Sequence, residues 1–164
     1  MVHPGRFSAA LEGDFVVFLI GARVNRWYKP ASMFWVGRAM TAMQKELTEQ
    51  AELGCLHIEN WSGRTSISVQ YWRSFEALEA YARSREAEHL PAWRKFNKLI
   101  KDNGDIGVWH ETFKVRDGEY EGFYGNMPRF GLADAGQHTR LGLKSTAALR
   151  SGTRQGDLAP VEAY

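Results

Sequence analysis

The stretch that decides the fold is Asp14–Asn25, DFVVFLIGARVN. Its residues from Phe15 to Ile20 are apolar without interruption, so a strand formed here must be covered on both faces. The apolar run is too short to span a bilayer, and charged and polar residues end it from Arg23 onward. We therefore predict that this stretch is the central strand of a sheet.

Helix and strand signals alternate after this strand. Apolar residues recur at three- and four-residue spacing over 33–51, which predicts an amphipathic helix after a cap at Ser32. Strands are expected at 55–61 and 65–73, a helix after a cap at Ser74, a further helical segment over 87–100 and a last strand at 107–116. The order β-α-β-β-α-β predicts an α+β, ferredoxin-like fold, a four-stranded antiparallel sheet with helices on one face.

The composition predicts that the N-terminal and C-terminal segments lie outside the ferredoxin-like domain. We expect an irregular N-terminal arm at 1–13, the ferredoxin-like domain at 14–132 and a flexible C-terminal tail at 133–164. The arm has no clear period, and the tail is dominated by small, polar and basic residues, so it should be mobile or ordered only against a partner. Before the tail, a turn at Asp117-Gly118 predicts a short return strand over 120–124.

Composition and charge exclude several classes of protein. The 164 residues are 44% hydrophobic and include six Trp, enough for one well-formed core. A net charge of +2 gives no electrostatic case for nucleic acid or a membrane surface. The single cysteine, Cys55, excludes an intramolecular disulfide and a cysteine zinc cluster. No signal-peptide pattern surrounds the apolar run of the first strand, so we expect a cytoplasmic protein.

The second face of the sheet needs a cover. Helices on one face would leave the two-sided apolar strand Phe15–Ile20 exposed on the other. We therefore predict a homodimer in which two sheets pack face to face.

Six segments carry a family resemblance: FVVFLIGARVN (15–25), QYWRS (70–74), EAYA (79–82), HLPAW (89–93), WHET (109–112) and NMP (126–128). Together they resemble the fumagillin-cluster monooxygenase-like family, otherwise a domain of unknown function. That family is placed among the dimeric α+β barrels, beside the antibiotic-biosynthesis monooxygenases. The resemblance covers Phe7 to Leu132. It implies a homodimeric barrel with a pocket in each subunit between sheet and helices. Some relatives in that superfamily oxidise aromatic or polyketide substrates with dioxygen and no cofactor, and others bind haem.

His110 and Glu111 are the first candidates for chemistry. The strand GVWHETFKV, at 107–115, directs them to opposite faces, so they cannot both point into one cavity. His110 could transfer a proton before dioxygen attack, or ligate haem iron; the alternative is a buried histidine that holds the strand by hydrogen bonds. Glu111 could orient the neighbours of His110, but an ion pair with Arg73 or Arg23 is the role we favour.

Three further groups are candidates for substrate binding. Tyr71 and Arg73 share one face of a strand and Trp72 takes the other, so one face could line the pocket; core packing would explain Trp72 equally well. His89 and Trp93 share a helical face that could hold a flat ligand or haem; the alternative is a kink beside Pro91 with a packed tryptophan.

Arg23 and Asn25, on one face of the first strand, could hold an anionic or carbonyl oxygen. The alternative, which we favour slightly, is a solvated strand end.

We predict a monooxygenase-like oxidoreductase that acts on a small apolar or aromatic molecule. The predicted catalytic residues are His110, Glu111 and Arg73, and the predicted substrate-binding residues are Tyr71, Trp72, His89, Trp93, Arg23 and Asn25. No glycine-rich phosphate loop is present, so a tightly held nucleotide cofactor is not indicated, and our prediction is a protein without a cofactor. One alternative is a haem protein of the same barrel class with His110 or His89 as the iron ligand. Another is a dimeric ligand-binding module without enzymatic activity.

Overall fold

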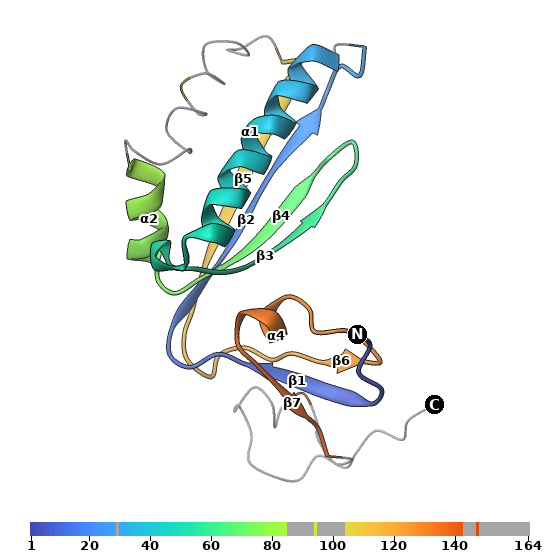
Figure 1. Ribbon diagram of the computed structural model, residues 1–164, viewed down its shortest axis with the longest axis vertical. Helices are drawn as coiled ribbons and strands as arrows, with labels where there is room; N and C mark the ends of the chain where they lie inside the picture. The colour runs from blue at the N-terminus through green and yellow to red at the C-terminus, as the bar shows by residue number, and fades with distance from the viewer. Residues whose placement is uncertain (29, 85–93, 95–103, 143–146, 148–164) are drawn as a thin grey trace. The chain divides into compact units, whose positions relative to one another are not determined.

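The computed structural model describes residues 1–28, 30–84, 94, 104–142 and 147 (Figure 1). The chain forms two compact units. One is Val16–Phe113, here called the sheet–helix unit. The other combines Met1–Phe15 with Lys114–Tyr164 and is here called the terminal unit.

The larger sheet has the predicted ferredoxin-like arrangement. Its elements in chain order are β2 (Phe15–Val24), α1 (Pro30–Glu49), the 3-10 helix η1 (Ala51–Leu53), β3 (Cys55–Trp61), β4 (Ile67–Trp72), α2 (Phe75–Arg83) and β5 (Ile106–Val115). The strand order is β3-β4-β2-β5, so β2 occupies an inner position. β4 pairs antiparallel with both β2 and β3. The helical segment predicted over 87–100 lies almost wholly outside the described residues.

Two local signals in the sequence position the ends of the helices. The Ser74 hydroxyl accepts a hydrogen bond from the Ala77 amide at 3.1 Å, which confirms Ser74 as the N-cap of α2. Gly54 adopts φ 91° directly before β3, a left-handed conformation that strains residues with a side chain. The chain therefore leaves η1 and enters β3 within one residue.

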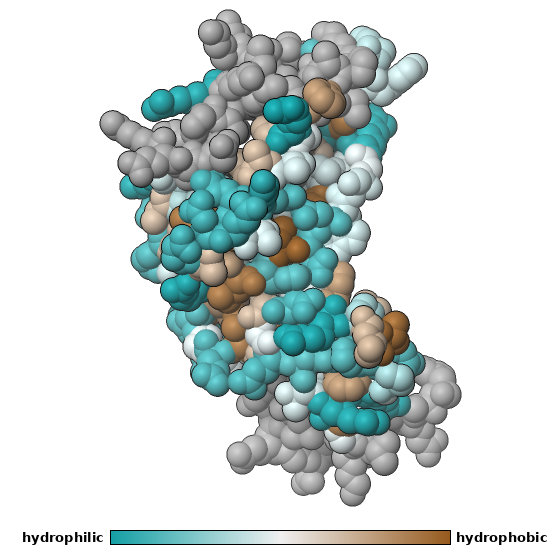
Figure 2. All heavy atoms as spheres, in the orientation of Figure 1, coloured by the Kyte–Doolittle hydropathy of each residue, from teal (hydrophilic) through white to brown (hydrophobic). Residues whose placement is uncertain are grey.

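The core lies on the face of the sheet that α1 and α2 cover. Its main cluster joins strand residues to helix residues: Val16, Cys55 and Trp72 pack with Leu47, Leu78 and Tyr81. A second cluster, Val36 and Ile106 with Ala22 and Met40, lies farther along α1. On the face shown in Figure 2, apolar side chains of the described residues reach the surface in separate small groups among polar ones.

The β2 strand has the two-sided character that its sequence indicates. Phe15 and Val16 are buried, and Val17 to Ile20 are half-buried. Gly21 allows a close approach, because a Cβ atom there would overlap the Ser66 carbonyl and lie 2.8 Å from Trp109 Nε1. Its inner position is confirmed, while the partner expected on the second face stays a prediction.

The terminal unit corrects the expectation of an irregular arm. Residues Arg6–Ala10 form β1, the inner strand of a three-stranded sheet in the order β6-β1-β7. The tail is also ordered where it is described: α4 (Leu132–Ala135) leads into β7 (Gln137–Arg140), which pairs antiparallel with β1. The sequence signal is weak because β7 is polar and its partner strand lies more than a hundred residues earlier. Most of the tail after residue 142 lies outside the described residues.

The short return strand also differs from the prediction. The strand β6 (Tyr124–Gly125) is shorter than the predicted 120–124, and it pairs with β1 rather than with the preceding strand. The Tyr120 hydroxyl explains the altered path, because it accepts from the Leu11 amide at 2.6 Å and donates to the Leu11 carbonyl at 2.8 Å. None of the described helices has the length and hydropathy needed to cross a membrane.

Candidate functional site

Two cavities lie end to end between α1 and the sheet, both within the sheet–helix unit. The smaller has a volume of about 40 Å³ and the larger about 240 Å³. Met40 and Gln44 line both, so these two side chains form the partition between the cavities. Pockets for small organic ligands typically have volumes of about 300–1,000 Å³. The larger cavity approaches that range, and the smaller is too small for an organic substrate.

The larger cavity has apolar and polar sides. Its apolar lining includes Ala22 and Val24 of β2, Val36 of α1 and Ile106 of β5. Its polar lining includes Thr41, Gln44, Asn60, Ser62, Ser66 and Ser68. Such a lining suits a small, mainly apolar molecule whose orientation is fixed by a few hydrogen bonds.

A chain of buried polar side chains follows β4 beneath both cavities. Trp72 Nε1 donates to Gln70 Oε1 at 2.9 Å, and Gln70 Nε2 contacts Ser68 Oγ at 3.5 Å. The three residues are 0%, 5% and 2% exposed, respectively. They alternate along the strand and therefore share its helix-covered face. Gln70 lines the smaller cavity and Ser68 the larger, so the chain connects the two.

A second hydrogen bond crosses from helix to sheet. Gln44 Nε2 of α1 donates to Asn60 Oδ1 of β3 at 2.7 Å. Both residues line the larger cavity, and Asn60 is exposed. This bond therefore lies at the solvent side of the cavity and holds α1 against β3.

The residues predicted around β4 separate as the alternation requires. Trp72 is fully buried and lines the smaller cavity. Tyr71 lies on the opposite face, with its ring 6.5 Å from that of His57. Arg73 is exposed just after the strand and donates to the Ala51 carbonyl at 3.2 Å. Of these three, the structure brings Trp72 alone to a described cavity.

His110 and Glu111 are both exposed on β5. The His110 ring lies 5.7 Å from Phe18, which lines the smaller cavity, so His110 is on the helix side and Glu111 on the other. The single chain therefore does not bury His110, which lies on a strand at the edge of the described sheet. The predicted ion pairs of Glu111 with Arg73 or Arg23 are not formed in the described structure, where Arg23 instead donates to Thr65 Oγ1 at 2.8 Å.

Arg23 and Asn25 do not reach the cavities. Both are exposed, and they flank Gly107, where a Cβ atom would lie 3.6 Å from Asn25 Nδ2. The Asn25 amide donates to the Asp105 carbonyl at 3.0 Å, so the main chain here joins the end of β2 to the start of β5. The geometry is that of a solvated strand end. His89 and Trp93 lie outside the described residues.

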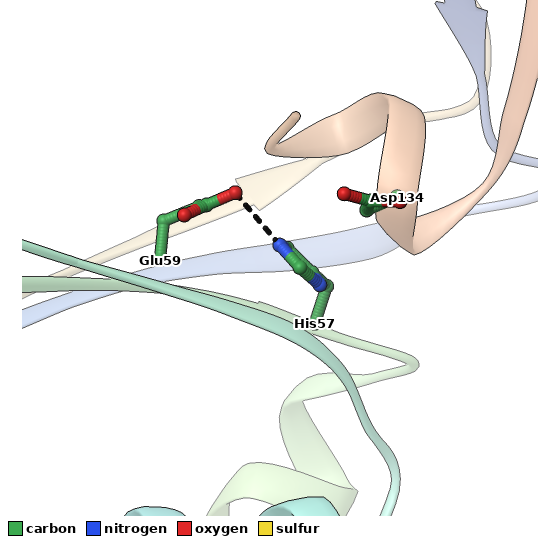
Figure 3. Close-up of side chains that lie close together, drawn as sticks. All are labelled: His57, Glu59 and Asp134. Carbon is green, nitrogen blue, oxygen red and sulfur yellow. Dashed lines mark hydrogen bonds and ion pairs between the residues drawn. The ribbon is translucent and has the colours of Figure 1, made fainter. Parts of the chain in front are cut away.

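Figure 3 shows a pair of ionisable side chains that the sequence analysis did not single out. His57 Nε2 lies 3.0 Å from Glu59 Oε1, and the two side chains are 24% and 23% exposed. They are two residues apart on β3, on the face opposite Ile58, which packs against the core. The pair is therefore outside both cavities. Asp134, also labelled in Figure 3, comes from α4 of the terminal unit.

Cys55 is not a nucleophile. Burial raises the pKa of its thiol to about 12, and a backbone hydrogen bond at His57 lowers it only in part. The thiolate is the reactive form of cysteine. At neutral pH Cys55 is therefore an apolar core side chain.

Sequence reasoning missed the polar residues of the cavity. For Ser68 and Gln70 a signal existed, because both share the face of Trp72 on an inner strand, where polar residues are unusual. Gln44 and Asn60 lie on different elements, sixteen residues apart, and no local pattern links them.

Comparisons with known proteins identify the family of this chain. The sequence profile of the monooxygenase af470-like family matches residues 15–132. Monooxygenase af470 of Aspergillus fumigatus is 31% identical over 127 residues, which are 70% of this chain and 44% of that protein. The chain thus spans less than half the length of this curated relative.

Two solved structures are also similar. Rv0793 from Mycobacterium tuberculosis is 18% identical with a TM-score of 0.45, over 60% of this chain and 92% of that one. A Bacteroides thetaiotaomicron protein of unknown function, described as a possible oxidoreductase, is 14% identical with a TM-score of 0.43, over 62% and 98% of the two chains.

Proposed function

We propose that this chain, which belongs to the monooxygenase af470-like family, is an oxidoreductase of the monooxygenase type. Its substrate is a small apolar or aromatic molecule, bound in the larger cavity between α1 and the sheet. The observation that carries the proposal is this 240 Å³ cavity with its apolar wall and buried polar chain, inside the part of the chain that the family profile matches.

The cavity suits oxidation of an apolar molecule for a physical reason. The apolar side of its lining lowers the polarity around a bound molecule, which strengthens each hydrogen bond made there. We assign proton transfer from the substrate to His110, which lines neither cavity but lies on the helix side of the sheet. Of the other two predicted catalytic residues, Glu111 lies on the opposite face and Arg73 donates to the Ala51 carbonyl, so neither reaches the larger cavity. His110 is on the helix side of β5, beside Phe18 of the smaller cavity, which makes it the better placed of the two neighbours His110 and Glu111.

The experiment is oxygen uptake measured with a panel of phenols and bicyclic aromatic ketones. Ala22→Leu, which adds three carbons within the larger cavity, should abolish uptake on any substrate that the wild type oxidises. Thr48→Val is the matched control, because Thr48 lines neither cavity and its hydroxyl donates to the Gln44 carbonyl at 2.8 Å. His110→Ala should lose turnover and keep ligand binding. Full activity of Ala22→Leu would contradict the location of the site.

The two alternative functions have their own readouts. A haem protein would show a strong absorption band near the blue edge of the visible spectrum. No described residue lining either cavity is a histidine that could ligate the iron. A binding module without activity would bind the same ligands and take up no oxygen.

A further inference from the structure

We propose that Ser68 selects the ligand of the larger cavity, by donating a hydrogen bond to an acceptor oxygen, such as a carbonyl, on a neutral and otherwise apolar molecule. The proposal rests on the proposed function, because it concerns the same cavity. The present proposal adds to the proposed function the side chain that orients the ligand and the chemical group that this side chain recognises.

Trp72 fixes the orientation of the Gln70 side-chain amide. An indole N–H donates and never accepts, so the Gln70 atom 2.9 Å from Trp72 Nε1 must be the amide oxygen. Turning the amide around would place two donors against each other in a site without solvent, since Trp72 is 0% exposed. The Gln70 nitrogen therefore faces Ser68, and it can only donate to the Ser68 oxygen.

Ser68 is then left with a hydrogen to donate. Its hydroxyl accepts from Gln70 at 3.5 Å, a long contact, and donates to no acceptor within the described part of the chain. The residue is 2% exposed and lines the larger cavity. A buried donor that makes no hydrogen bond destabilises the folded state. The structure thus favours an acceptor atom in the cavity beside Ser68.

The other hydroxyls of the cavity differ from Ser68. Ser66 both accepts from the Ala22 amide at 3.1 Å and donates to the Ala22 carbonyl at 3.2 Å. Thr41 donates to the Gly37 carbonyl. Ser62 is exposed and has access to water. Ser68 is therefore the buried hydroxyl of this described lining with a hydrogen available to a ligand.

The lining also limits the charge of the ligand. The described residues around the larger cavity include no ionisable side chain, so a carboxylate or ammonium group would lose its hydration without gaining a partner. A carbonyl oxygen has a smaller desolvation cost and accepts one bond from Ser68. A water molecule that occupied this position would be displaced by that oxygen at little net cost.

The test compares two molecules that share a ring system, 1-tetralone with its carbonyl and tetralin without it. Dissociation constants are measured by NMR titration for the wild type, Ser68→Ala and the control Thr48→Val, whose hydroxyl donates to the Gln44 carbonyl at 2.8 Å and which lines neither cavity. Because a net hydrogen bond is worth about 0.5–1.5 kcal/mol, Ser68→Ala should weaken tetralone binding by roughly 2- to 10-fold and leave tetralin unchanged. Thr48→Val should leave both dissociation constants unchanged.

Three outcomes would overturn the proposal. Unchanged dissociation constants for both molecules in Ser68→Ala would refute the role of Ser68 and leave the cavity as a binding site. A loss of affinity for both molecules in equal measure would show that Ser68 has a packing role alone. No binding of either molecule to the wild type would refute the proposed site itself. Ser68→Cys, a weak donor of similar size, replaces Ser68→Ala in the comparison if the alanine variant does not fold.

Discussion

Replacing Trp72 by phenylalanine should destabilise the protein chiefly by leaving Gln70 without its donor. Trp72 is fully buried and its indole N–H is the donor to Gln70 Oε1. Loss of that donor leaves a buried acceptor unpaired, which costs about 1–3 kcal/mol. The smaller ring adds a cavity term of about 24 cal/mol per Å³ of space that does not close. The free energy of unfolding, measured in urea, should fall by the sum of the two terms.

A double-mutant cycle separates these two terms. On the Gln70→Leu background the acceptor is absent, so Trp72→Phe there should cost the cavity term and not the hydrogen-bond term. The loss of stability should therefore be smaller than in the wild type by about 1 kcal/mol or more. Equal costs on the two backgrounds would refute a hydrogen-bonded chain along β4. They would also remove the argument that orients Gln70 toward Ser68.

Three further results are expected. Burial raises the pKa of Cys55 from 9.0 to about 12, so the folded state keeps a proton that the unfolded state loses. Between pH 9 and 12 the free energy of unfolding should therefore fall faster in the wild type than in Cys55→Ala, by up to about 1.4 kcal/mol per pH unit. Parallel curves of unfolding free energy against pH for the two proteins would contradict this. Gly21→Ala should lower the free energy of unfolding by about 3 kcal/mol, because its Cβ would overlap the Ser66 carbonyl. Gly37 has open space and a helical position, so Gly37→Ala should raise the free energy of unfolding by up to about 1 kcal/mol. Similar melting temperatures for these two variants would refute the close approach at Gly21. Light scattering should give a dimeric mass at micromolar concentration, as the two-sided β2 strand predicts, and a monomeric mass would count against the homodimer.

The sequence was sufficient for the sheet–helix unit because its signals are local. The apolar run of β2, the stripe on α1 and the Ser74 cap each act within a few residues, and these elements form close to the predicted positions. The cap predicted at Ser32 is wrong, because α1 begins at Pro30 and Ser32 lies inside it. The three-stranded sheet had no such signal. Its inner strand β1 is five residues long and pairs with β7, across most of the chain. Only the tertiary pairing gives these two segments their structure.

The candidate site was less predictable than the fold. Alternation correctly separated Tyr71 from Trp72 and His110 from Glu111. It could not show that β5 lies at an edge, and this position exposes both His110 and Glu111. Nor could it show that α1 passes over β4, which makes Ser68 and Gln44 lining residues of one cavity. The sequence favoured ionisable residues as catalytic candidates, whereas the polar residues that line the larger cavity are neutral.

The most direct test of the account is methyl NMR of protein labelled at its five methionines during a titration with 1-tetralone. Met40 lines both cavities, whereas Met127 is exposed in the terminal unit. We predict that the Met40 methyl resonance shifts in a saturable way and that the Met127 resonance does not move. A saturable change at Met127 with Met40 unmoved would place binding outside the cavity and contradict the central claim.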